Sequence, residues 1–518
     1  MSLPNLHFLP PEILHDIVLE TMSDGFESLM LSCRTIYARG GCYITTHNAL
    51  RKKWSHIVVG YSHWHSQRGH PWMGLKDLIY TISRDAIIAG YIKSVKFEFK
   101  PDTVPGPVPE GHWVRDEAEL EELKAFVRGS KYLQRAGVDV DGWVAKMFAE
   151  RPARIYPAHT TTFLMTLLEG VESLEFDAHL WQNGVKHASV ECRSELSEVI
   201  ELVARDTRRP NKQGGSCALS KLRVLRTTGL QPVKYGPHPA EVGWGSLASL
   251  LALENLEELA LQHPTSVCYR PDPFQDRIMG SFSWPYPELS SNLRRLELVW
   301  GRIPEFQIGS LLAHTPRLES LKYVHHDNRE HPRPGWDAGA FVAEVGKHCG
   351  DRLTDLHIEC DHFDRIVTRG VVSMREFTRL RTVWLGGLIF CGAPYVAGSA
   401  RSHSRDDARW DLSTLHPLTK ILPPSVTRLC LEVGDYIVLS LGHNHLQPPQ
   451  SHTWLVLAPL ISGFAKNRAT CLPQLEQFVV RCRQPYQERQ GHEEVRAARA
   501  AAEAEGVVFR RILGLPRN

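Results

Sequence analysis

The sequence predicts an α/β protein in which a small N-terminal helical module precedes an irregular array of strand–helix units stacked as a solenoid, or horseshoe. A short pattern, apolar-x-x-apolar-x-apolar, returns along most of the chain and ends in the alternation typical of half-buried strands. A segment with helical spacing precedes most copies of this pattern. The opening segment carries apolar residues at helical spacing instead, which predicts a separate helical module.

Two short helices are predicted in the N-terminal module. Pro10 and Pro11 suit a first helical turn, because proline fixes φ near the helical value and no amide donor is needed there. Ser23-Asp24-Gly25 predicts a stop and a new start with its Asp as N-cap, and Gly40-Gly41 predicts the end of the second helix. Helices of this size bury little surface alone, so we expect a partner to cover them. Their apolar residues are Ile13, Leu14, Ile17 and Val18, then Phe26, Leu29, Met30, Cys33, Ile36 and Tyr37.

The repeated pattern predicts strands at residues 92–97, 171–176, 222–225, 256–261, 293–298, 318–323, 353–358, 380–385, 426–431 and 475–480. Helical spacing precedes many of them, at residues 162–169, 245–253, 306–314, 338–348 and 454–464. One such unit cannot bury its apolar faces, so the units must stack. A closed α/β barrel, an open doubly wound sheet and a curved solenoid all satisfy this requirement, and the leucine-rich consensus favours the solenoid.

Changes in composition divide the chain. We predict a docking module at residues 1–50, a helical connector at 51–90, and the repeat array at 91–518 with insertions at 101–160 and 391–411. The first insertion carries an acidic helix at 116–127, which we interpret as a solvated helix face. A helix at 493–505 and a final strand at 507–509 form a natural cap for the array.

The N-terminal residues resemble an F-box over roughly residues 6–50. The resemblance is carried by Leu9-Pro10-Pro11-Glu12-Ile13-Leu14, Ile17, Leu29, Cys33-Arg34 and Tyr37. It implies docking onto the Skp adaptor of a cullin–RING ubiquitin ligase. The residues that would meet the adaptor by this match are Leu9, Pro10, Ile13, Leu14, Ile17, Leu29 and Cys33. The linker at 22–27 departs from the shorter, proline-containing turn that is common in the family.

The strand pattern resembles degenerate leucine-rich repeats over residues 90–510. The units are spaced by roughly 25 to 50 residues, which is wider than the usual ~20–29. The asparagine that usually follows the strand is replaced by Gly301, His326, Asp361 and Leu388. We therefore expect irregular turns, with loops inserted on one face.

The strand alternation also predicts a binding face. If the pattern leucines face the core, the residue between the last two lies on the opposite, concave face. Mixed charge with an aromatic residue is typical of a protein-binding patch, although a plain solvated face with a loop over Trp384 is the alternative. The residues predicted to bind a client there are Arg226, Glu297, Lys322, His357 and Trp384, and Glu175 falls on the same face.

The composition limits the classes of binding partner and the cellular compartment that we expect. A net charge of +2 and a pI of about 8.0 favour neither nucleic acid nor an anionic membrane surface. We expect no membrane span and no secretory signal. The 11 cysteines are scattered without a C-x-x-C pair, which points to free thiols in the cytoplasm or nucleus.

Catalytic motifs are not found. Gly346-Lys347 lacks both the spacing and the following Ser/Thr of a phosphate loop. The histidines and tryptophans of residues 54–72 fit no ligand set and are interpreted as packing or surface residues. A zinc site is only weakly signalled by His325, His326, His357, Cys360 and His362, so no metal or cofactor is expected.

The resemblance, together with the repeat array behind it, therefore implies a non-enzymatic substrate receptor of an SCF-type ligase. Its expected partners are the Skp adaptor, the cullin scaffold and a protein client. The alternatives are a stand-alone repeat scaffold and, less favoured, an α/β enzyme, which would need convergent polar residues at the strand ends.

Overall fold

A computed structural model of the chain describes residues 10–61, 74–99, 116–149, 157–177, 195–209, 217–228, 242–262, 264–265, 283–301, 303–326, 336–360, 367–390, 395–396, 408–409, 412–433, 456–482 and 492–513. Leu9 and most of the predicted insertion at 391–411 lie outside these residues. The chain divides into two compact units, Met1–Leu259 and Ala260–Asn518. Each unit is described by itself below.

The first unit begins with helices and continues into strands. Its helices are α1 (Pro11–Thr21), α2 (Phe26–Ser32), α3 (Arg34–Arg39), α4 (Gly41–Trp54), α5 (Leu75–Arg84), α6 (Ile87–Tyr91), α7 (Glu117–Arg128), α8 (Lys131–Ala136), α9 (Val140–Ala149), α10 (Ala158–Met165), α12 (Glu195–Thr207) and α13 (Trp244–Leu251). Its strands are β1 (His56–Tyr61), β2 (Ser94–Phe99), β3 (Ser173–Asp177), β4 (Val224–Thr228), β5 (Val242–Gly243) and β6 (Glu258–Gln262), the last of which contains the boundary between the units.

The second unit alternates strands with helices. Its strands are β7 (Pro264–Thr265), β8 (Arg295–Gly301), β9 (Ser320–His325), β10 (Trp336–Asp337), β11 (Asp355–Cys360), β12 (Val367–Arg369), β13 (Thr382–Gly386), β14 (Tyr395–Val396), β15 (Ala408–Arg409), β16 (Arg428–Val433), β17 (Gln477–Cys482) and β18 (Val508–Leu513). Its helices are α14 (Glu305–Leu312), α15 (Ala338–Cys349), the 3-10 turns η5 (Gly387–Phe390) and η7 (Leu412–Thr414), α16 (Leu418–Ile421), α17 (Leu457–Leu460), α18 (Phe464–Cys471) and α19 (His492–Glu503).

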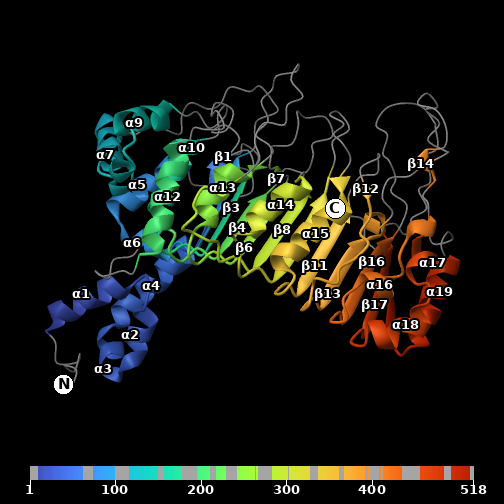
Figure 1. The fold of residues 1–518 in the computed structure, drawn as a ribbon. Coiled ribbons are helices and arrows are strands. Elements are labelled where there is room, and N and C mark those ends of the chain that lie inside the picture. The colour runs from blue at the N-terminus through green and yellow to red at the C-terminus, as the bar shows by residue number, and fades with distance from the viewer. Residues whose placement is uncertain are drawn as a thin grey trace, which may run out of the picture. The chain divides into compact units, whose positions relative to one another are not determined.

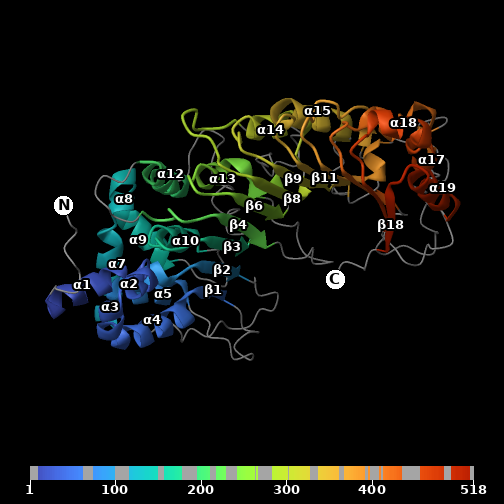
Figure 2. The same cartoon turned by 90° about the horizontal axis from the view of Figure 1, so that it is seen from below.

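The main sheet of the described residues is a 12-stranded parallel sheet in the order β1-β2-β3-β4-β6-β8-β9-β11-β13-β16-β17-β18. The strands follow chain order and end at two free edges, so the sheet is not a closed barrel. The order also lacks the reversal that defines a doubly wound sheet. In the second unit, α14, α15 and α18 lie on the same face of the sheet (Figure 1, Figure 2).

The predicted strands are confirmed. Their alternating residues lie on the two faces of the sheet, one buried and one partly exposed. In β9, Leu321 and Tyr323 are 1% and 0% exposed, while Lys322 between them is partly exposed. The same pattern holds in β11, where Leu356 and Ile358 flank a partly exposed position. Each residue pairs in register with its equivalent on the next strand, so the buried positions stack into one continuous layer within the unit.

Three expectations about element boundaries are wrong. The sheet starts at β1, inside the predicted connector at 51–90, because residues 56–61 pair with β2. The helix expected over 454–464 is divided between α17 and α18, since Gly463 adopts the left-handed φ of 65° there. The second N-terminal helix is divided into α2 and α3, and α4 begins directly at Gly41.

Within the first unit, the N-terminal helices α1, α2 and α3 project from its remaining elements, and α4 joins them to β1 (Figure 1). The predicted insertion at 101–160 is helical where it is described, with α7, α8 and α9. Its acidic helix is not only solvated, because Glu119 accepts a hydrogen bond from Tyr80 at 3.1 Å and Glu122 pairs with Arg84 at 2.7 Å. None of the described helices combines the length and the apolar character needed to cross a membrane.

Candidate docking sites

Helix α1 has an inner and an outer apolar side. Leu14, Val18 and Met22 follow one another at four-residue spacing on the inner side and are 5%, 1% and 2% exposed. Ile13 is 46% exposed on the outer side, and Ile17, one turn further on, is partly exposed. The inner side therefore holds the module together, while the outer side leaves an apolar stripe open to a partner.

Cys33 divides the remaining helical segment. Its backbone is extended (φ −157°, ψ 154°), and its Sγ accepts a hydrogen bond from the Ile36 N–H at 3.4 Å, which caps α3. Leu31 and Tyr37, on either side of this break, are 80% and 54% exposed. Among the described residues nine large hydrophobic side chains are exposed, and four of them lie in α1–α3, namely Ile13, Leu19, Leu31 and Tyr37. Exposed apolar side chains are thus concentrated in the N-terminal module.

The predicted adaptor contacts differ in accessibility. Pro10 is exposed at the start of α1, and its carbonyl accepts the Leu14 N–H at 3.0 Å. Leu29 and Cys33 are partly buried, whereas Leu14 is buried inside the module and has little area to offer. Leu31 and Tyr37 offer more apolar area. Leu31 lies off the apolar stripe of the predicted second helix, so helical spacing did not select it.

The linker between α1 and α2 is anchored to the rest of the first unit. Asp24 does not cap α2: Gly25, with φ of 93°, precedes that helix, and the Asp24 carboxylate instead pairs with Lys93 at 3.2 Å and with Lys221. Burial raises the pKa of Asp24, but Lys221 and Lys93 outweigh it, so the pKa lies below its usual value of 3.8. The linker that departs from the F-box pattern is therefore the attachment point of the module.

Buried polar contacts and close packing also hold α1 and α2 against α4 and α6. We call this contact region, together with the Asp24 ion pairs, the junction. The His47 ring is 6% exposed, and its Nδ1 lies 2.8 Å from both the Met22 carbonyl oxygen and the Tyr91 hydroxyl. The same ring stacks on Phe26 with a centroid separation of 4.5 Å. A Cβ built on Gly90 would lie 2.5 Å from the Ser23 Oγ, so only glycine fits there without a shift. These contacts fix the position of α1 and α2 relative to α4 and α6.

The predicted client-binding residues are divided between the two units. Arg226 lies in β4 of the first unit, where its side chain is 56% exposed and 3.8 Å from the Glu258 carboxylate. The other four occupy one register row of the second unit, because Glu297 pairs with Lys322, Lys322 with His357, and His357 with Trp384. The structure thus brings four of the five predicted residues side by side.

This row has a charged end, formed by Glu297 and Lys322, and an aromatic end, formed by His357 and Trp384. Glu297 and Lys322 form an ion pair with each other. The His357 ring stacks on Trp384 at 4.8 Å with an interplanar angle of 16°. The Arg481 guanidinium lies over the same indole, 5.0 Å from its centroid. The buried indole N–H of Trp384 has no hydrogen-bond partner among the described residues.

A second row of the same face carries buried carboxylates that sequence reasoning missed. Glu359, two residues after His357, is 0% exposed and shares a hydrogen bond with the Nε2 of that imidazole. Glu432 is 2% exposed and lies 3.6 Å from the Arg481 guanidinium. Buried carboxylates are stable only with such partners. The signal was a charged residue directly after the last apolar position of the pattern, which applies to Glu359, Glu432 and Arg481 alike.

A buried thiol and several histidines lie on or near this face. Cys430 lies beside Trp384 in register, and burial, supported by the Glu432 charge, raises the pKa of its thiol to about 12, so it is protonated and a poor nucleophile at neutral pH. Within the described part of the chain, no three His, Cys, Asp or Glu side chains converge as metal ligands. His325 instead contacts the Tyr323 hydroxyl at 2.8 Å and stacks on Trp336, while His362 lies outside the described residues.

Comparison with known proteins adds no assignment: no protein-family model matches the chain, and no curated protein matches its sequence.

Proposed function

We propose that this chain is the substrate-recognition subunit of an SCF-type cullin–RING ubiquitin ligase. In this proposal α1–α3 form an F-box that docks on the Skp adaptor, and the sheet with its helices is a degenerate leucine-rich-repeat solenoid that binds a protein client. The subunit performs no bond chemistry and acts by raising the effective concentration of the client near the ligase.

The concentration of exposed apolar side chains in α1–α3 carries the proposal. Ile13, Leu31 and Tyr37 are 46%, 80% and 54% exposed although the opposite side of the module is buried. Fully burying an aliphatic side chain contributes roughly 1.5–3 kcal/mol, and Ile13 and Leu31 would gain the share of it that corresponds to their exposed area. A micromolar complex needs about 8 kcal/mol, so a few such side chains supply a substantial share of the affinity.

The stacked row of the second unit supports the client-binding half. Tryptophan and arginine are enriched among the residues that dominate protein interfaces, and here Arg481 and His357 hold the Trp384 ring between them in fixed geometry. A side chain already fixed in the free protein loses less entropy on binding. Trp384 is therefore the proposed anchor of the client surface, with Lys322 and Glu297 beside it.

The test is co-purification of the full chain with the Skp adaptor and cullin. We expect the double variant Ile13→Asp/Leu31→Asp to lose the adaptor, because both charges would be buried without a partner in the complex. The matched control is Phe306→Asp/Val372→Asp, which alters side chains that are 59% and 60% exposed in the second unit, and it should retain the adaptor.

Both double variants should unfold at nearly the wild-type temperature, since all four side chains are exposed. Retention of the adaptor by Ile13→Asp/Leu31→Asp would contradict the proposal and would favour a stand-alone repeat scaffold.

A further inference from the structure

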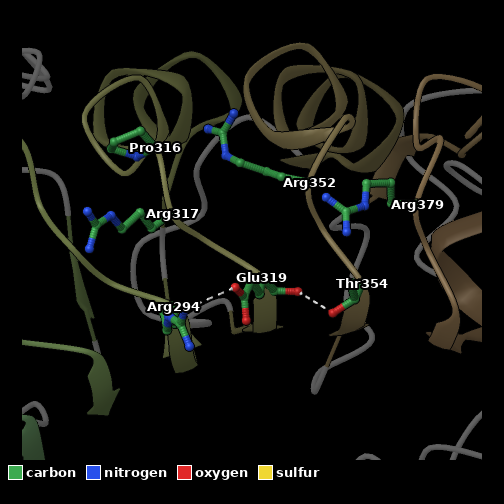
Figure 3. Close-up of a pocket in the computed structure, with 7 residues that line it drawn as sticks. All are labelled: Arg294, Pro316, Arg317, Glu319, Arg352, Thr354 and Arg379. Atoms are coloured by element: carbon green, nitrogen blue, oxygen red, sulfur yellow. Dashed lines mark hydrogen bonds and ion pairs between the residues drawn. The ribbon is translucent and has the colours of Figure 1, made fainter.

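A cavity of about 300 Å³ lies at the amino-terminal ends of β8, β9 and β11, on a part of the second unit that the proposed function does not use. It is lined by Arg294, Pro316, Arg317, Glu319, Arg352, Thr354 and Arg379. Figure 3 shows Arg317, Arg352 and Arg379 around the space above Glu319 and Thr354. Four guanidinium groups thus line one small cavity together with a single carboxylate.

The repeat geometry places these arginines together. Arg317, Arg352 and Arg379 each directly precede the leucine that opens one copy of the strand pattern. Those leucines, Leu318, Leu353 and Leu380, are all 0% exposed. Neighbouring parallel strands are about 4.8 Å apart, so the preceding arginines are brought to one edge of the sheet.

The lining of the cavity carries more positive than negative charge. Arg294 pairs with Glu319 at 3.8 Å, which offsets one guanidinium. Arg317 and Arg379 have no hydrogen bond or ion pair within the described residues, and both are exposed. Arg317 and Arg379 are therefore available to a ligand. Their positive charges repel the other guanidinium groups of the cavity, and a bound anion would reduce this repulsion.

Arg352 is held in place but not fully satisfied. Its Nη1 pairs with Asp351 at 3.2 Å, and its Nη2 donates to the Thr315 carbonyl oxygen and the Cys349 Sγ, both at 3.5 Å. Its Nε is buried and has no hydrogen-bond partner in the described part of the chain. Thr354 is already engaged, because its Oγ1 donates to the Glu319 carbonyl oxygen at 3.0 Å.

We propose that this cavity binds a phosphate monoester group. A guanidinium presents its N–H groups as a planar fork that matches two oxygens of a phosphate, and a dianion with three terminal oxygens can engage more than one arginine. The volume is at the lower end of the range of about 300–1,000 Å³ typical of ligand pockets, so the site takes the phosphate and a small part of what carries it. The phosphate can belong to a free small molecule or to a phosphorylated side chain.

Calorimetric titration of the full chain at constant ionic strength tests the proposal with two probes, inorganic phosphate and N-acetyl-phosphoserine amide. We expect saturable binding of at least one probe. Arg317→Gln/Arg379→Gln should weaken it by roughly tenfold or more, since charge-assisted hydrogen bonds are lost. The matched control, Arg209→Gln/Arg369→Gln, removes the same charge at side chains that are 71% and 84% exposed outside the cavity, and it should bind as the wild type does.

Tighter binding of the phosphoserine probe would assign the site to a phosphorylated side chain, and equal or tighter binding of inorganic phosphate would assign it to a free phosphate ligand. Absence of saturable binding for both probes overturns the proposal, as does an equal loss in the two double variants. The outcome is separable from the ligase proposal, because adaptor binding involves α1–α3 and not the residues of this cavity.

Discussion

Apolar side chains are more exposed to solvent in the N-terminal helices than in the sheet of the second unit. In the sheet, Leu296, Leu321 and Leu356 are 0%, 1% and 1% exposed, and each is covered by equivalent residues of the neighbouring strands. In the module, Ile13 and Leu31 are 46% and 80% exposed. In a stacked array, each unit buries its apolar side chains against the next unit. A few short helices have no such neighbour on one side, so apolar side chains there stay exposed.

The two regions also differ in how they are held. The sheet repeats one contact many times, while the module is attached through a small number of specific contacts at the linker. They include the Asp24 ion pairs with Lys93 and Lys221, the His47 contact with the Met22 carbonyl, and the close approach of Gly90 to Ser23. Loss of one contact should therefore have a local and predictable effect in each region.

The largest difference should come from shortening one leucine in each region. Leu356→Ala is expected to lower the free energy of unfolding by about 2–5 kcal/mol, because it leaves a cavity in a closed core. Leu31→Ala should change it by less than about 0.5 kcal/mol, since that side chain is 80% exposed. Urea unfolding followed by circular dichroism measures both. Equal shifts of the midpoint would show that the two leucines do not differ in packing.

The strands of the array could be predicted because alternation with a period of two assigns every residue to a face. The one strand of the main sheet that was not predicted, β1, carries the same pattern in Trp54, Ile57 and Val59. The histidines and tryptophans that follow Trp54 hide this pattern, because they break the contrast between apolar and polar positions. The register of β11 and β13 likewise places His357 beside Trp384, as the shared pattern position implies.

The module was less predictable for a physical reason. Ile13 and Leu14 are adjacent and both apolar, and helical spacing alone does not say which one faces inward. The partners of Asp24 were also hidden, because Lys93 and Lys221 lie 69 and 197 residues further along the chain. Contacts of this kind depend on tertiary structure, so a capping role was the natural local interpretation of that aspartate.

A smaller effect is expected at the glycine contact that supports the junction. A Cβ on Gly170 would lie 2.8 Å from the carbonyl carbon of Gly90, which in turn packs against Ser23. Gly170→Ala must displace backbone and should cost about 1–3 kcal/mol of unfolding free energy. Gly41→Ala is the control, since a Cβ there meets nothing within 4 Å, and it should be neutral or slightly stabilising in α4. A neutral Gly170→Ala would mean that the junction is not closely packed.

The smallest effect, and the most specific to the junction, should come from the charge of Asp24. Lys221 and Lys93 hold its pKa below 3.8 against the opposing effect of burial, so its contribution to stability is fully present above the unfolded pKa and is lost as the pH falls through the folded one. Asp24→Asn should cost about 0.5–1 kcal/mol near neutral pH, a range typical of ion pairs that are partly exposed.

That difference from the wild type should shrink below about pH 4, because the wild-type carboxylate then becomes protonated while asparagine does not change. Asp141→Asn is the matched control, since its carboxylate is 80% exposed and pairs only with Arg128 among the described residues, and it should cost less at neutral pH. Thermal unfolding across this pH range measures both variants. A cost of Asp24→Asn that is the same at acidic and neutral pH would mean that the shape of the side chain, and not its charge, holds the linker against Lys93 and Lys221.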